Sequence, residues 1–389
     1  MHRFSDAEME RRLAALRRLM DYVGLDAVVT TSFHNTLYYS NFWMTPFGRG
    51  HYAVIPRRGD PAVIAPRIEF DRPEKLSWFD DVRIYRDTRS PLDGAIRNVA
   101  DVLADRGISR GRIGIEEGYT PHSLYKGLEI VLAGFELVDV SHAIMREQVV
   151  KSDEEVAHIR HGAEIATLGA EAFEAALKEG VREIDVARSA VTAMEDEIAR
   201  RFPDAEHEGT FSWCQFGIEH TYVAHNPNTA RTLGPHELIS LNVFPMIAGY
   251  YHLLERSIFV GDMPDETRKP FEVCSQAHEA GIAAVRPGVR CNEIDDHVNP
   301  VFEKAGYLQD RTFGTGHSFG IMGRWYGRDE IGELRPYNDT VLEPNMIISI
   351  EPMISVPGIG GFRHADMLLV TEDGAEVLTT FRRGVIVTG

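Results

Sequence analysis

Residues 180–185 read Gly-Val-Arg-Glu-Ile-Asp, and residues 288–295 read Gly-Val-Arg-Cys-Asn-Glu-Ile-Asp, a second copy about 110 residues further on. Each copy follows a segment with helical spacing, residues 277–285 for the second copy, and each precedes another helical run. Such a repeat predicts a pseudo-symmetric domain built from two similar halves. Chance recurrence of a short Gly, Glu and Asp pattern is the alternative, and the matching flanking segments favour the repeat.

The boundary of this domain is expected close to residues 149–152. Ser152 and Glu155 have the spacing of a capping box, which marks the start of a helix. The Ala- and Glu-rich helix that follows is expected to run toward Lys178 and to stop at Gly180. We therefore assign residues 1–150 to one domain and residues 151–389 to the pseudo-symmetric domain.

The first domain alternates between strands and helices. Its first helix is predicted from apolar residues at helical spacing, namely Met9, Leu13, Leu16 and Met20. Gly24 is expected to end that helix. Residues 25–30 (LDAVVT) and the later segments HYAVIP, DPAVIAP and RIGIEEG are read as strands, with a helix over residues 95–105. This alternation predicts an α/β domain, so the chain as a whole is assigned to the α/β (α+β) class.

The charge of the chain excludes two classes of partner. Its 389 residues include 41 basic and 59 acidic side chains, a formal net charge of −18. Residues 1–150 carry a net −1 and residues 151–389 a net −17. Nucleic-acid binding depends on Lys and Arg, and an anionic membrane surface also attracts basic segments. We therefore expect no nucleic-acid partner and no membrane partner.

Cysteine usage and hydropathy indicate the compartment. Three cysteines without a CxxC pattern argue against a disulfide scaffold or a zinc ribbon and fit a reducing compartment. The first 20 residues lack the apolar core of a secretory signal, and no apolar stretch approaches the ~20 residues of a membrane helix. We expect a soluble, cytoplasmic protein.

Two glutamates lie within apolar strands of the second domain. Glu255 falls in ISLNVFPMIAGYYHLLERSIF (residues 239–259) and Glu351 in IISIEPMI (residues 347–354). A buried carboxylate costs free energy unless it is paired, so both are candidates for catalysis or ligand binding. The alternative is a salt bridge to a structural arginine, and Arg256 is adjacent to Glu255.

Histidines and arginines in loop-like segments add to these candidates. His225 precedes Asn-Pro and so lies on an extended or turn segment, and His317 is flanked by a glycine that permits close approach of a ligand. A lone histidine is more often structural, but these two occur together with the glutamates. Arg328 lies in an aromatic-rich loop, and Phe47 and Arg49 flank a glycine in a segment that is otherwise read as a surface loop.

Taken together, these segments resemble the pita-bread family of methionine aminopeptidase, aminopeptidase P and prolidase, and within it the creatinases. The resemblance spans nearly the whole chain. It is carried by TSFHNTLYYSNF, PFGRG, AHNPNT, SLNVFPMIAGYYHLLERSIF, RTFGTGHSFG, WYGRDE, TVLEPNM and IEPMI. It implies a creatinase-type N-terminal α/β domain followed by a pseudo-symmetric pita-bread catalytic domain.

The resemblance also implies that no metal or other cofactor is needed. Metal-dependent relatives use two Asp, a His and two Glu as ligands, and the matching positions here are Phe244, Glu255, His317, Glu351 and Ala365. Phe and Ala cannot ligate, and three remaining candidates are too few for a pair of metal ions. Glutamates without a metal need another cation, and a planar guanidinium matches carboxylates through bidentate N–H groups.

For the substrate, the creatinases imply a small zwitterionic guanidino compound, creatine. Glu255 and Glu351 are expected to hold its guanidinium. Arg328 and Arg49 are expected to hold its carboxylate, with Arg49 and the packing residue Phe47 coming from the other subunit of a homodimer that shares its active sites.

For the chemistry, the resemblance assigns His225 as general base and then general acid. Tyr251 and His317 are expected to line the pocket. His225 would take a proton from water as the water attacks the guanidinium carbon, and would return it to the sarcosine nitrogen as urea leaves. General acid–base help of this kind contributes roughly 10²–10⁴-fold.

One position departs from the creatinase pattern. Creatinases have a second active-site histidine where this sequence has Ala365, and the neighbouring residue is His364. Adjacent strand residues face opposite sides, so either a local bulge brings His364 into the pocket or the pocket lacks this imidazole. A related guanidino or amide-bearing small acid is therefore an alternative substrate.

Two other functional classes are weighed against this hypothesis. A metal-dependent Xaa-Pro peptidase is disfavoured by the missing ligands. A non-enzymatic binding module is disfavoured because a scaffold has no need for a histidine, two glutamates and two arginines in one pocket.

Overall fold

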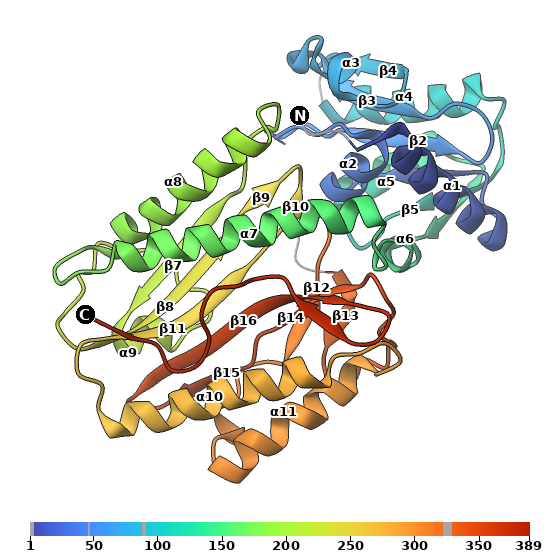
Figure 1. The fold of residues 1–389 in the computed structure, drawn as a ribbon. Coiled ribbons are helices and arrows are strands. Elements are labelled where there is room, and N and C mark those ends of the chain that lie inside the picture. The colour runs from blue at the N-terminus through green and yellow to red at the C-terminus, as the bar shows by residue number, and fades with distance from the viewer. Residues whose placement is uncertain (1–3, 46, 88–90, 322–328) are drawn as a thin grey trace. The chain divides into compact units, whose positions relative to one another are not determined.

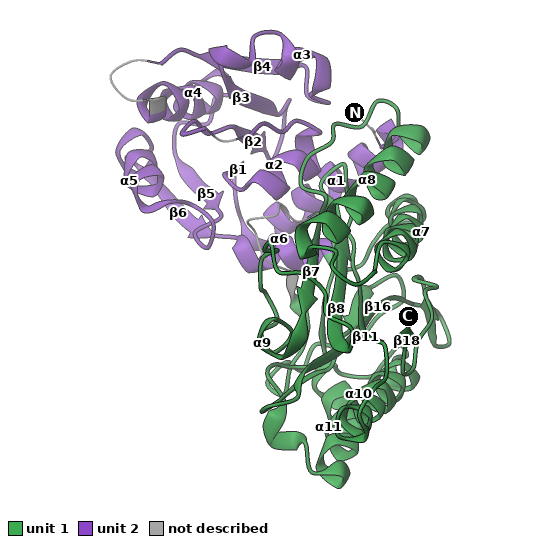
Figure 2. Ribbon diagram, turned by 90° about the vertical axis from the view of Figure 1, so that its left-hand side faces the viewer, with its two compact units in different colours: residues 1–2, 149–389 green, residues 3–148 purple. Residues whose placement is uncertain are grey.

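The computed structural model describes residues 4–45, 47–87, 91–321 and 329–389. The chain forms two compact units (Figure 2). Of the described residues, those up to Gln148 form the N-terminal unit and those from Val149 onward form the C-terminal unit. Within the described ranges, no helix is both long enough and apolar enough to span a membrane.

A mixed sheet in the order β4-β3-β2-β1-β5-β6 forms the centre of the N-terminal unit. Its strands are β1 (Ala27–Thr30), β2 (Tyr52–Pro56), β3 (Ala62–Pro66), β4 (Asp81–Tyr85), β5 (Gly111–Ile115) and β6 (Phe135–Asp139). The helices are α1 (Asp6–Val23), α2 (Phe33–Ser40), α3 (Arg72–Leu76), α4 (Pro91–Asp105), α5 (His122–Val131) and α6 (Ser141–Gln148), with a short 3-10 helix η1 (Arg67–Glu69).

The first helix confirms the sequence prediction. The apolar residues used to predict α1 are all buried, namely Met9, Leu13, Leu16 and Met20. The helix ends at Gly24, whose φ of 78° is left-handed and favours a residue without a Cβ atom.

A second sheet, whose neighbouring strands in the order β13-β12-β14-β16-β11-β8-β7 are all antiparallel, forms the centre of the C-terminal unit. Its strands are β7 (Phe211–Phe216), β8 (Glu237–Phe244), β11 (Leu254–Val260), β12 (Gly316–Ser318), β13 (Asp329–Leu334), β14 (Ile347–Ile350) and β16 (Gly360–Val370). Strands β15 (Met353–Val356) and β17 (Ala375–Val377) pair with β16, and β18 (Val387–Thr388) pairs with β11. Strands β9 (Met246–Ile247) and β10 (Tyr250–Tyr251) form a separate hairpin.

Two helix pairs pack along this second sheet (Figure 1). Helices α7 (Asp153–Ala175) and α8 (Glu183–Arg201) contact β8 and β7, and α10 (Asp265–Ala284) and α11 (Cys291–Ala305) contact β16 and β13. The short helices α9 (Gly217–Thr221) and η2 (Leu308–Asp310) complete the unit. The capping box predicted for α7 is confirmed, with Ser152 and Glu155 bonded reciprocally, but α7 ends at Ala175 rather than near Lys178. The fold confirms the predicted α/β (α+β) class.

The two copies of the repeated motif have equivalent backbone contacts. Each copy exchanges two backbone hydrogen bonds of 2.8–2.9 Å with a leucine further along the chain. In the first copy, Gly180 and Val181 bond to Leu233. In the second copy, Gly288 and Val289 bond to Leu342. Helix α8 then begins at Glu183, and α11 begins at Cys291. Glu183 and Cys291 therefore occupy equivalent positions in the two halves.

Strand register decides which side chains share a face of the second sheet. Trp213, Asn242, Glu255 and Ala365 lie directly opposite one another across β7, β8, β11 and β16. Their neighbours Leu241, Val243 and Leu254 join the apolar core that includes residues of α7 and α8. Because side chains alternate along a strand, the row from Trp213 to Ala365 lies on the face away from these helices, which we call the site face.

Candidate active site

The two glutamates identified from sequence are buried neighbours. Glu255 of β11 is 3% exposed, and Glu351, the residue after β14, is 6% exposed. The backbone N–H of Glu351 donates to the carbonyl oxygen of Thr315 at 2.7 Å, which fixes the chain at this point. Burial raises the pKa of Glu255 to about 7; Arg363 opposes this shift and the charge of Glu351 adds to it.

An arginine that sequence reasoning missed is paired with Glu255. Nε of Arg363, on β16, lies 2.9 Å from Oε2 of Glu255, and both side chains are 4% exposed. Nη2 of Arg363 also donates to Oδ1 of Asn242 and, at 3.3 Å, to the carbonyl oxygen of Ala224, the residue before His225. Arg363 thus links one buried carboxylate to the loop that carries His225.

Arg256, which was considered from sequence as the salt-bridge partner of Glu255, pairs with a different carboxylate. It faces the opposite side of the sheet from Glu255, where Nη2 donates to Oδ1 of Asp366 at 2.7 Å. His278 Nε2 lies 3.3 Å from the other oxygen of Asp366. Strand alternation was the signal that could have excluded Arg256, because adjacent residues cannot share a face. It could not have identified Arg363, whose contact depends on the pairing of β11 with β16.

His317 lies beside the second carboxylate. Its Nε2 atom is 3.6 Å from Oε1 of Glu351, an ion pair only when the imidazole is protonated. Its Nδ1 atom is 2.9 Å from the carbonyl oxygen of Ser318, and its backbone N–H donates to Oγ of Ser349 at 3.0 Å. Nδ1 must carry a proton to donate to the carbonyl oxygen of Ser318. The other ring nitrogen, Nε2, is the one that faces Glu351.

His225 is exposed in the segment after α9, and its ring contacts Trp213 edge-on at a centroid distance of 5.5 Å. Nε2 of Gln215 donates to the carbonyl oxygens of Val223 and Asn226 at 3.2 and 3.3 Å. The residues on either side of His225 are therefore tied to the end of β7.

Aromatic rings line the site face next to these groups. Tyr251 stacks between Phe244, at 5.6 Å, and Phe319, at 6.0 Å. Burial, followed by the charges of Glu255 and Glu351, raises the pKa of the Tyr251 phenol well above its ordinary value. The phenol therefore keeps its proton and is a hydrogen-bond donor close to both carboxylates.

The predicted residues of the N-terminal unit are at its surface. Phe47 is 80% exposed. Arg49 is paired with Asp87, with Nε 2.9 Å from Oδ2, and this contact lowers the pKa of the Asp87 carboxyl. Arg328 lies outside the described residues.

Of the two alternatives for His364, the register of β16 contradicts the local bulge and agrees with a site that lacks this imidazole. It pairs in register with Arg256, on the face opposite Glu255, while Ala365 pairs with Glu255. Its Nε2 atom is 2.8 Å from the carbonyl oxygen of Gly384, and its ring packs on Phe271 of α10. The site face therefore has the methyl group of Ala365 at this position.

Comparison with known proteins identifies the family. Residues 157–372 match metallopeptidase family M24, and residues 12–150 match the creatinase/prolidase N-terminal domain. A creatinase from Bacillus sp. (strain B-0618) is 41% identical over 385 residues, which cover 98% of this chain and 92% of that protein. A putative dipeptidase from Bacillus subtilis (strain 168) is 27% identical over 353 residues, covering 91% of this chain and 93% of that protein.

The fold agrees with these matches. The prolidase from Pyrococcus horikoshii OT3 has a TM-score of 0.81 to this structure at 23% identity, covering 97% of this chain and all of that one. The chain belongs to metallopeptidase family M24, as a hydrolase whose N-terminal unit is of the creatinase/prolidase type. Within that family it is creatinase-like, which confirms the resemblance drawn from its sequence motifs.

The family name implies metal ions, but the residues present do not fit a metal pair. Phe244 stacks its ring in the site and Ala365 contributes a methyl group, so neither position has a donor atom. The guanidinium of Arg363 already pairs with Glu255, so Glu255, Glu351 and Arg363 together carry one negative charge, which is too little to balance two divalent ions. Over the described part of the chain, no three His, Cys, Asp or Glu side chains are grouped to hold a metal.

Proposed function

We propose that this protein hydrolyses creatine to sarcosine and urea. The observation that carries the proposal is the charge pattern of the site face. Glu255, Glu351 and Arg363 are buried together, and with all three ionised they sum to one negative charge. One guanidinium balances that charge, and its N–H groups match carboxylate oxygens bidentately. The creatinase at 41% identity supports the same substrate class.

In the proposed reaction, Glu255 and Glu351 hold the guanidinium and His225 moves the proton. His225 takes a proton from a water molecule whose oxygen attacks the guanidinium carbon. The tetrahedral intermediate then breaks its bond to the sarcosine nitrogen, which receives the proton from His225, and urea leaves. Positioning and preorganised charge supply the rest of the acceleration.

The carboxylate of creatine is proposed to bind two arginines. One is Arg328, and the other is Arg49 of a second subunit, with Phe47 packing on the substrate from the same loop. Arg49 would exchange Asp87 for the substrate carboxylate, so that its guanidinium stays paired throughout.

A substrate panel tests this proposal. Purified protein is incubated with creatine, other guanidino acids and N-methyl amino acids, and the release of urea and amine is measured. Urea and sarcosine in equal amounts from creatine support it. Turnover of another guanidino or amide-bearing acid alone would assign a different substrate, and no turnover at all would favour a binding module.

A chelator separates this reaction from the peptidase activity suggested by the dipeptidase and prolidase relatives. We expect dialysis against EDTA to leave urea release unchanged, because Phe244 and Ala365 offer no donor atoms and Arg363 already neutralises Glu255. Elemental analysis of the same sample should find no stoichiometric transition metal. Hydrolysis of an Xaa-Pro dipeptide that is lost with EDTA and restored by Mn²⁺ would establish the peptidase instead.

Creatine binding should release protons near neutral pH. Burial raises the pKa of Glu255 to about 7, so a share of the free sites holds a protonated Glu255 near neutral pH. A bound guanidinium favours the carboxylate and expels that proton, so affinity rises with pH between about 6 and 8. Calorimetry in two buffers of different ionisation enthalpy measures the release. The Glu255→Gln protein should show none, and equal release by both proteins would contradict the assignment.

A further inference from the structure

One fully buried carboxylate holds both ends of the segment that carries His225. Glu183, the first residue of α8, is 0% exposed. Its Oε1 atom accepts the backbone N–H of Phe216 at 2.8 Å and lies 2.6 Å from Nδ1 of His220. Its Oε2 atom accepts the backbone N–H of Thr229 at 2.9 Å and the hydroxyl of Thr229 at 2.6 Å. His225 lies between these attachment points.

Two other side chains, Arg363 of β16 and Ser355 of β15, donate to the carbonyl oxygens of Ala224 and Tyr222 at 3.3 and 2.8 Å. The contacts of this segment with the end of β7 are more local. Gln215 at the end of β7 bonds to carbonyl oxygens next to His225. Asn228 accepts the backbone N–H of Cys214 at 2.7 Å and donates to the carbonyl oxygen of Ser212 at 2.8 Å. These bonds join the segment to the strand that precedes it, whereas Glu183 joins it to a helix that packs on the sheet.

The pseudo-symmetry of the unit shows that the fold itself does not require this carboxylate. Cys291 occupies the equivalent position in the second half, at the start of α11. That half still forms the same pair of backbone hydrogen bonds, between Gly288–Val289 and Leu342. At the first position of the helix, a carboxylate is therefore present in the half whose loop carries His225 and not in the other half.

We infer that Glu183 is a positioning residue, which holds the His225 segment in the geometry needed for proton transfer. The inference rests on the proposed role of His225. Its four contacts fix the backbone on both sides of His225, and a shift of about 1 Å in a reacting group can cost about 100-fold in rate. Glu183 need not touch the substrate for its loss to slow the chemical step.

The test is Glu183→Gln, which keeps the size of the side chain and replaces one acceptor oxygen by an NH₂ donor. That donor must face either the N–H of Phe216 or the N–H of Thr229, so one end of the segment is released. We expect kcat for creatine to fall about 100-fold, with KM changed less than about threefold. Amide hydrogen exchange should become faster in residues 217–229 and stay unchanged in β8 and β11.

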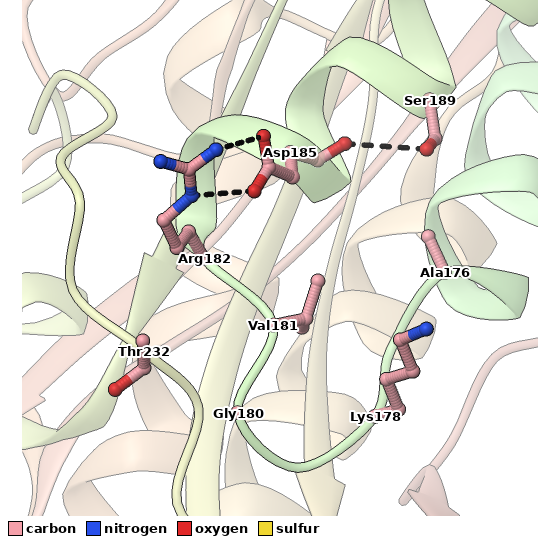
Figure 3. A pocket seen from close by; sticks show the side chains of 8 residues that line it. All are labelled: Ala176, Lys178, Gly180, Val181, Arg182, Asp185, Ser189 and Thr232. Atoms are coloured by element: carbon pink, nitrogen blue, oxygen red, sulfur yellow. Dashed lines mark hydrogen bonds and ion pairs between the residues drawn. The ribbon is translucent and has the colours of Figure 1, made fainter.

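Two control variants separate positioning from general destabilisation. Asp185→Asn breaks the exposed pair with Arg182 on the same turn of α8, where both residues line a surface pocket of about 650 Å³ (Figure 3). Glu116→Gln makes the identical chemical change in a buried carboxylate of the N-terminal unit, which accepts hydrogen bonds from Thr31 and Ser32. Both controls should keep wild-type kcat at temperatures where they are folded.

A milder variant covers the case in which Glu183→Gln does not fold. Thr229→Val removes the hydroxyl that donates to Glu183 and accepts the backbone N–H of Arg231, and it keeps the backbone bond from Thr229 to Glu183. It should lower kcat about tenfold, with faster exchange in the same segment. The inference is overturned if Glu183→Gln lowers kcat no more than Glu116→Gln does. It is also overturned if amide exchange in residues 217–229 is unchanged in both Glu183→Gln and Thr229→Val. If the wild-type protein does not hydrolyse creatine, the proposed function fails, while the exchange measurement still decides whether Glu183 orders the segment.

Discussion

The His225→Ala protein is expected to hydrolyse creatine about 10²–10⁴-fold more slowly than the wild type, with nearly the same dissociation constant for creatine. The loss follows because His225 is the group proposed to take the proton from water and to return it to the leaving nitrogen. Binding should be retained because the groups proposed to hold the guanidinium are Glu255 of β11 and Glu351 after β14, which are both buried. Urea release measures kcat, and calorimetry measures the dissociation constant.

His161→Ala is the matched control for this change. His161 lies on α7, exposed, with Nδ1 3.7 Å from a carboxylate oxygen of Glu164. Helix α7 packs on the side of the sheet away from the site face. Removal of the His161 imidazole should therefore change neither kcat nor the affinity for creatine. Near-normal kcat in the His225→Ala protein would remove His225 from the mechanism, and a large loss in the control would show that the assay reports stability instead.

The Arg363→Met protein is expected to lose about 3–5 kcal/mol of unfolding free energy at pH 8, because the change leaves the charge of Glu255 buried without its partner. Methionine keeps the length and the apolar contacts of the side chain. The loss should shrink toward pH 5. With its partner gone, Glu255 has a folded-state pKa still further above the unfolded value, so protonation at low pH removes the buried charge. Urea denaturation at the two pH values measures the difference.

A double-mutant cycle isolates the pair. Adding Glu255→Gln to Arg363→Met should recover most of the lost stability, because neither member then carries a charge. If the stability losses of the two single variants simply added in the double variant, the 2.9 Å contact between Arg363 and Glu255 would contribute no free energy of its own. Arg182→Met, which breaks the exposed pair with Asp185, should cost only about 0–1 kcal/mol.

Local signals in the sequence were sufficient for much of the fold. The apolar spacing that ends at Gly24 identified α1, and the spacing of Ser152 and Glu155 identified the start of α7. Helix periodicity and capping depend on contacts within a few residues, so they are visible without any tertiary information. The end of α7 was placed too late because the Ala- and Glu-rich composition continues past Ala175, where the chain turns toward α8.

Candidate residues of the site could be named from sequence, but their partners could not. A carboxylate within an apolar strand stands out by itself, which is why Glu255 and Glu351 were found. The contact of Glu255 with Arg363 joins residues 108 positions apart and exists only because β11 and β16 pair in one register. The same register directs His364 away from the pocket and aligns Ala365 with Glu255.

The amino-acid sequence alone therefore defined the family, the repeated motif and the residue types available for chemistry, because these depend on identity and short-range spacing. Tertiary structure decided which of those residues meet. Side chains alternate along a strand, so a shift of one residue in the pairing would exchange every group between the two faces. That choice of face made Arg363 the partner of Glu255 and Arg256 the partner of Asp366.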